Sequence, residues 1–138
     1  MNELEHFRNI FGGSNYRIDE PLNFNSSKEL DQCAKEIASK NLSDSFMNYT
    51  IEGLLKSLLY YVTSENFVGT PTLEECLKIL KKANISDYNT KNNYLTDIFS
   101  ELKFDSPAKM YYKSIEILPD KKYVDVVNSL IQILEKMI

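Results

Sequence analysis

The chain has 138 residues, 43 % of them apolar, which is enough to bury the core of one domain and leaves no room for a second. Its 20 acidic and 16 basic side chains give a net charge of −4, which argues against binding duplex DNA through overall charge. No apolar run approaches the roughly 18 residues that a membrane-spanning helix needs, and the N-terminus, with Glu3 and Glu5, does not resemble a signal peptide. We therefore expect an intracellular protein.

The first part of the chain divides near residue 15. Residues 2–11 have the apolar spacing of a short helix, which Gly12-Gly13-Ser14 would end. The same Gly-Gly-Ser is typical of a hinge or of an engineered tag, so we interpret residues 1–15 as an N-terminal segment that is either flexible or artificial. Residues 16–138 are predicted to form a single all-α domain. Within it, residues 16–25 lack helical periodicity and are predicted to run extended over the core.

The second predicted helix begins at Ser26 and runs to about Lys40. Ser26 and Glu29 have the spacing of a capping box, and apolar residues repeat behind them at helical spacing.

The most hydrophobic predicted helix runs from about residue 43 to residue 65, behind a cap at Ser43 or Asp44. Its apolar positions cover well over half of the helical circumference, so other helices must cover it on several sides. They are Phe46, Thr50, Ile51, Leu54, Leu55, Leu58, Leu59, Tyr61 and Val62. Only one narrow polar edge remains, where Glu52 and Lys56 stand four residues apart in the favourable order. We expect this helix to be the centre of the fold.

Four further helices are predicted after this central one. A capping box at Thr72 and Glu75 opens a helix that ends near Ala83, and Ser106-Pro107 opens another that Pro119 closes. Apolar periodicity predicts the remaining two over 94–103 and from about 120 to the C-terminus. The sequence thus predicts an all-α fold, a compact bundle of six or seven helices around the central hydrophobic helix. No repeat of 20 to 50 residues indicates a solenoid.

A search for catalytic chemistry finds no convincing pattern. The single histidine, His6, cannot build a His-based triad or a His metal site, and the only Gly-Gly is not followed by the Lys-Ser/Thr of a phosphate-binding loop. Cys33 and Cys76 lie on apolar helix faces, so we interpret them as plain buried thiols, with a disulfide or a metal site as alternatives. We predict no catalytic residue, no metal site and no cofactor.

Two features are weak signals of binding. Lys109 and Lys113 lie one helical turn apart, and Lys121 and Lys122 follow the next proline, so four cations could cluster beside Tyr123. Such a cluster could contact phosphates or an acidic partner, with Tyr123 offering a stacking face; the alternative is a solvated polar face. The second feature is the pair of tandem tyrosines, Tyr60-Tyr61 and Tyr111-Tyr112. Because successive helical residues point about 100° apart, each pair could place one ring in the core and the other near the surface, and simple core packing is the alternative.

The order of several short motifs resembles one family. Glu20-Pro21-Leu22 resembles an Asn-Pro-Leu/Phe lead-in, and Asp44-Ser45-Phe46-Met47 resembles an Asp-Pro-Phe-Trp helix opening. Further matches in the same order are Leu54-Leu55 to Tyr60-Tyr61, Thr72 to Leu80, Ser106-Pro107-Ala108 to Tyr112, and the last helix from Tyr123. Together they are similar to the all-alpha domain of type IV coupling proteins, the TraG/TraD-type ATPases that bring DNA to a conjugative secretion channel.

This resemblance covers about residues 20–137, while residues 1–15 match no family. The chain departs from the family pattern at three motif positions. Met47 stands where a tryptophan is usual, Glu20 where an asparagine is, and Ser45 where a proline is. These departures leave the subfamily and the partner open.

In that family the domain is inserted into a RecA-like motor between its nucleotide-binding motifs, neither of which is present here. The resemblance implies a cytoplasmic recruitment module of a membrane-anchored, hexameric parent, which recognises a relaxase, an accessory processing protein or the transferred DNA. It would not hydrolyse ATP itself, would bind DNA weakly, would not contact the membrane through this segment and would be a monomer when isolated. The alternatives are a freestanding helical DNA-binding or regulatory adaptor of a mobile element and a small phage adaptor.

Overall fold

The computed structural model describes residues 16–40 and 44–138, so the helix expected over residues 2–11 and the alternative cap Ser43 lie outside the described residues. The described residues form six α-helices and no strand, which confirms the all-α fold. The helices are α2 (Ser27–Ala38), α3 (Ser45–Val62), α4 (Leu73–Ala83), α5 (Tyr94–Ser100), α6 (Pro107–Glu116) and α7 (Asp120–Glu135). None of these helices combines the length and the apolar character needed to cross a bilayer.

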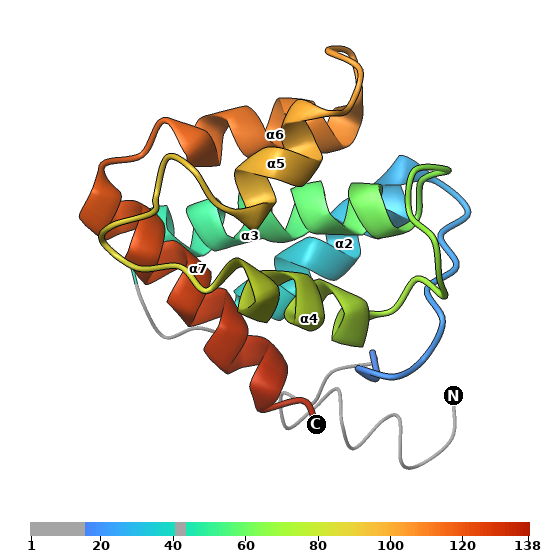
Figure 1. The fold of residues 1–138 in the computed structure, drawn as a ribbon. Coiled ribbons are helices and arrows are strands. Elements are labelled where there is room, and N and C mark those ends of the chain that lie inside the picture. The colour runs from blue at the N-terminus through green and yellow to red at the C-terminus, as the bar shows by residue number, and fades with distance from the viewer. Residues whose placement is uncertain (1–15, 41–43) are drawn as a thin grey trace.

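Helix α3 lies at the centre of the bundle, as predicted. It packs directly against α2, α4, α6 and α7, and Figure 1 shows it running through the middle of the molecule between α6 and α4. The short α5 packs on α4 and α6 and reaches α3 through the edge contact of Phe99 with Tyr61, whose ring centroids are 6.0 Å apart. Five apolar α3 side chains have no exposed surface: Ile51, Leu54, Leu55, Leu58 and Leu59.

The predicted helix starts are correct, because side chains accept hydrogen bonds from the free amides of the first turns. Asp44 Oδ1 accepts from the Met47 amide at 2.7 Å, and Thr72 Oγ1 accepts from the Glu75 amide at 3.0 Å. Ser26 caps α2 in the same way. The start of each of these three helices is therefore specified locally.

The reciprocal half of each predicted capping box differs from the prediction. Glu29 accepts from the backbone amide of Asn25 at 2.6 Å, one residue before the expected Ser26. Glu75 forms an ion pair with Lys78. Helix α6 has the predicted proline at its first position, but the Ser106 side chain accepts no hydrogen bond from the amides of the first turn. A complete capping box does occur at Asn93 and Thr96, which open α5.

A buried chain of polar groups ties the start of α5 to α6 and α7. The hydroxyl groups of Tyr112 and Tyr123 share a hydrogen bond of 2.6 Å, and Asn93 Nδ2 donates to the Tyr123 hydroxyl at 3.1 Å. Both tyrosines have almost no exposed surface. Buried polar groups of this kind are stable only when paired, so the network fixes how the three helices meet.

The loop between α4 and α5 also holds the junction between α6 and α7. Lys91 Nζ donates to the backbone carbonyls of Glu116 and Leu118 at 3.1 and 3.3 Å, which are the last carbonyls of α6 and its turn. Thr90 Oγ1 donates to Asp120 Oδ1 at 2.6 Å. The turn that leads into α7 is therefore held in one position.

Candidate binding surface

The structure does not gather the four predicted lysines around one point. Lys109 Nζ donates to the carbonyls of Ser100 and Leu102 at 3.3 and 3.1 Å, where it closes the C-terminal end of α5. Lys122 Nζ lies 5.4 Å from the centre of the Phe46 ring, at the start of α3. Lys109 lies in the first turn of α6 and Lys122 in the first turn of α7, so the two cations lie on different helices and contact different neighbours. Lys113 and Lys121 are exposed.

The prediction that Tyr123 offers a stacking face is wrong. Its side chain has no exposed surface, and its hydroxyl is bound by Tyr112 and Asn93. Tyr123 stands three and seven residues before Val126 and Leu130, which are also fully buried, so all three share the core face of α7. This spacing in the sequence indicates that Tyr123 is buried.

The tandem tyrosines follow the prediction in one pair and not in the other. Tyr112 is buried while Tyr111 is half-buried, as expected, but Tyr60 and Tyr61 are both half-buried. Tyr60 stacks on Tyr111 with ring centroids 5.6 Å apart and planes 7° from parallel. These rings thus join α3 to α6.

The polar edge of α3 is recessed between α2 and α6. Lys56 Nζ and Glu52 Oε2 form an ion pair of 3.0 Å, although their side chains are only 17 % and 18 % exposed. Lys56 also lies over the Tyr111 ring, and the Tyr60 hydroxyl donates to Asp31. Burial is the largest single influence and lowers the pKa of Lys56, but the hydrogen bond to Glu52 and the nearby charges of Glu52 and Asp31 together raise it by more, so the pKa is raised and the lysine stays charged. These charges already have partners, and we assign this edge a structural role.

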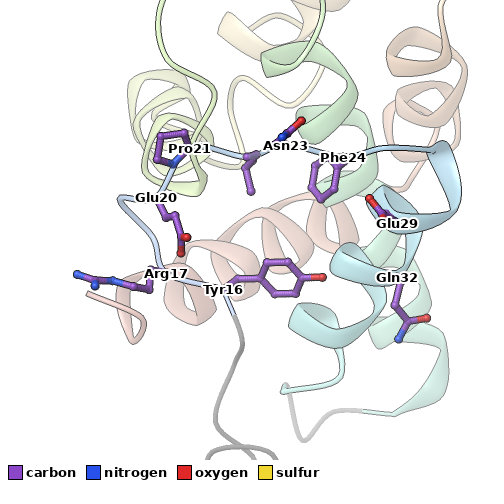
Figure 2. Close-up of a pocket in the computed structure, with 9 residues that line it drawn as sticks. Tyr16, Arg17, Glu20, Pro21, Asn23, Phe24, Glu29 and Gln32 are labelled. Atoms are coloured by element: carbon purple, nitrogen blue, oxygen red, sulfur yellow. The ribbon is translucent and has the colours of Figure 1, made fainter. Parts of the chain in front are cut away.

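A pocket of about 440 Å³ lies between the extended segment 16–24 and the first turns of α2. Figure 2 shows Tyr16 pointing across it towards α2. Two of the three charged groups on its wall are bound to neighbours: Glu29 accepts from the Asn25 amide, and Arg17 pairs with Asp19 at 3.5 Å. The segment itself is fixed by the Leu22 amide, which donates to the Pro71 carbonyl at 2.7 Å. These groups hold the segment in place, so the pocket is the weaker candidate.

One face of α3 carries exposed aromatic rings. The sequence predicts that Phe46 is covered, but its side chain is 56 % exposed, and Tyr49 is 75 % exposed. Both share a helix face with Gly53, where an added Cβ would lie 3.8 Å from Ile115 Cδ1 of α6. This face of α3 therefore lies near α6 at Gly53 and near α7 at Phe46, where Lys122 of α7 lies over the ring.

The turn between α6 and α7 lies at the same end of the bundle as the start of α3 (Figure 1). Ile117, the first residue after α6, is 79 % exposed, and Lys121 and Lys122 lie in the first turn of α7. We call this surface the α3–α7 patch and define it as Phe46, Tyr49, Ile117, Lys121 and Lys122.

The two lysines of the α3–α7 patch are not neutralised by the described part of the chain. No carboxylate there lies within 4.0 Å of either ammonium group. Both lysines also stand at the N-terminal end of α7, where the helix dipole is positive and cations are unfavourable. Their charge does not stabilise the helix, so it is available to attract an anionic group.

Two further results bear on function. No group of three His, Cys, Asp or Glu side chains among residues 16–40 and 44–138 could hold a metal ion. No family model, curated protein or solved structure matches the chain.

Proposed function

We propose that the chain is a substrate-recruitment domain, which binds a relaxase or an accessory processing protein for a type IV coupling protein. The order of motifs between residues 20 and 137 supports this proposal. The observation that carries it is the α3–α7 patch, in which the exposed Phe46 ring lies beside Lys122 and neither lysine has an ion-pair partner among the described residues. Phe46 belongs both to this patch and to the motif Asp44–Met47.

The composition of the patch favours a protein partner over DNA. Aromatic residues are enriched in protein interfaces, and an exposed apolar cluster rimmed by charge is typical of them. Sequence-independent DNA binding depends on many phosphate contacts and weakens as salt rises. The patch has two lysines on a chain whose net charge is −4. We therefore expect single-stranded DNA binding to be weak.

A freestanding helical DNA-binding or regulatory adaptor is the second candidate. Single-stranded nucleic acid binders also combine exposed rings for stacking with cations for the backbone, and here Lys122 lies beside the exposed ring of Phe46. A native gene with nucleotide-binding motifs on both sides of this segment would distinguish a coupling protein from an adaptor.

The test is a pair of titrations of the purified domain, one with the relaxase of the same genetic element and one with a labelled oligonucleotide. We expect relaxase binding of moderate affinity and oligonucleotide binding that is lost as salt rises. Replacing Lys121 and Lys122 by alanine should weaken relaxase binding by about tenfold, because both lie in the patch.

The matched control replaces Lys109 and Lys113, which lie outside the patch, and should leave relaxase binding unchanged. The two variants thereby separate the four predicted lysines into a pair expected to contact the relaxase and a pair expected not to. Tight, salt-resistant oligonucleotide binding without relaxase capture would reverse the proposal in favour of a DNA-binding adaptor.

A further inference from the structure

We infer that the α3–α7 patch binds a short segment of a partner protein in which a large apolar side chain is flanked by carboxylates. This inference rests on the proposed function, since it takes the same patch as the recruiting surface, and it adds the chemistry of what is bound.

The apolar part of the patch provides a place for one anchoring side chain. Phe46 and Tyr49 lie three residues apart on α3, and Ile117 stands on the turn after α6. Each of them is more than half exposed. Covering such a cluster with an apolar side chain removes water from both surfaces, which is the usual source of affinity at the centre of a protein interface.

The charges around the patch specify carboxylates. Three acidic residues lie close to it in sequence: Asp44 caps α3 through the Met47 amide, Asp120 accepts from Thr90, and the exposed Glu116 forms no ion pair with either lysine of the patch. Asp125, one turn further along α7, forms no ion pair with either lysine of the patch. Lys121 and Lys122 are thus two cations at the rim of the apolar cluster without an ion-pair partner among the described residues.

The same groups disfavour the other classes of occupant. A basic segment would meet two like charges, which is unfavourable. For a nucleic acid strand, one face of Phe46 is already occupied by the Lys122 ammonium group at 5.4 Å, and Ile117 offers no ring on which a base could stack. A segment with an apolar anchor and flanking carboxylates would cover the apolar cluster and pair with the lysines at its rim.

The test is a selection of short random peptides displayed on phage, with the purified domain as target. We expect the selected peptides to share a large apolar residue with Asp or Glu on either side of it. The same selection on a K121E/K122E variant should instead enrich Lys and Arg around the apolar residue. Selected peptides that are neutral or basic with the wild-type chain, or that do not change with the charge reversal, would overturn the inference.

One selected peptide is then titrated against single variants by fluorescence anisotropy. Phe46→Ala should weaken its binding by about tenfold or more, whereas Tyr88→Ala is the matched control, because Tyr88 is an aromatic side chain that is 98 % exposed in the loop between α4 and α5. A circular dichroism spectrum confirms that each variant is folded. Equal affinity for both variants, or displacement of the peptide by an oligonucleotide of deoxythymidine at equal concentration, would contradict the inference.

The outcomes separate this inference from the proposed function. Selection of acidic apolar peptides together with no relaxase binding would refute relaxase recruitment and leave the chemistry of the patch standing. Relaxase binding that is unchanged by Phe46→Ala and by K121E/K122E would support recruitment and refute the patch as its site.

Discussion

Leu58→Ala is expected to lower the free energy of unfolding by about 2 to 5 kcal/mol, the range for large-to-small changes in packed cores. Leu58 has no exposed surface and belongs to α3, which packs against four other helices. The surrounding helices cannot all move inward to fill the space left by the lost methyl groups. Leu55→Ala, at an equally buried position, should have a similar effect. Urea unfolding followed by circular dichroism measures both.

The choice of control variant follows from the structure. The sequence suggests Lys56→Ala as a mild change, but Lys56 is recessed and its removal would leave Glu52 without its partner. Lys113 is exposed and outside every ion pair among the described residues, so Lys113→Ala should change the free energy of unfolding by less than about 0.5 kcal/mol. If Leu58→Ala and Leu55→Ala lowered the free energy of unfolding no more than this control does, α3 would not be the central helix.

Raising the pH above 9 is expected to lower the free energy of unfolding steeply. Burial raises the pKa of the Cys33 thiol from 9.0 to about 12, and burial also raises the pKa of Cys76. Both are free, buried thiols, as predicted. The pKa of Tyr112 is raised by burial and then by its neighbour Tyr123. In the folded state all three groups therefore stay protonated at pH values where the unfolded chain ionises.

The sign of this effect follows from proton counting. Above pH 9 the unfolded chain has lost thiol protons that the folded chain retains, so stability falls as pH rises, at least until the folded Cys33 thiol ionises near pH 12. Each thiol contributes a slope of about 1.4 kcal/mol per pH unit, and Tyr112 adds to the slope above pH 10.

Urea midpoints between pH 7 and pH 11 measure the effect of pH. The control is the double variant Cys33→Ala/Cys76→Ala. Between pH 9 and pH 10 the free energy of unfolding of this variant should fall less steeply with pH than that of the unchanged chain, whatever the variant's stability at pH 7. A stability that is constant up to pH 11, or the same slope in both proteins, would show that the thiols are not buried in this way.

The helices were predictable because their signals are local. Asp44 and Thr72 cap helices where the sequence places caps, and the apolar spacing of α4 and α7 matches their buried faces. The ends were less accurate. Helix α3 ends at Val62, three residues early, where the hydroxyl groups of Thr63 and Ser64 bond to the carbonyls of Leu59 and Tyr61. Such side-chain bonds to the backbone compete with the helix, and apolar periodicity does not report them.

The candidate surface was only partly predictable, because exposure depends on where neighbouring helices end. The sequence predicted a lysine cluster beside the Tyr123 ring. Lys122 does lie over an aromatic ring, but that ring is Phe46, and Tyr123 is buried. Phe46 has the periodicity of a core residue, yet a lysine lies over it where an apolar side chain would have covered it. Lys109 looked free in sequence, and only the fold shows that it closes α5.

Relaxase titration with two double variants tests the recruitment surface most directly. F46A/I117A removes an aromatic and an aliphatic side chain from the α3–α7 patch, and F104A/M110A removes a matched pair at the start of α6, where both side chains are also more than half exposed. We predict that the first variant loses relaxase affinity by about tenfold or more while the second binds as the unchanged chain does. Equal binding by both variants, or a loss confined to F104A/M110A, would contradict the assignment of recruitment to the patch.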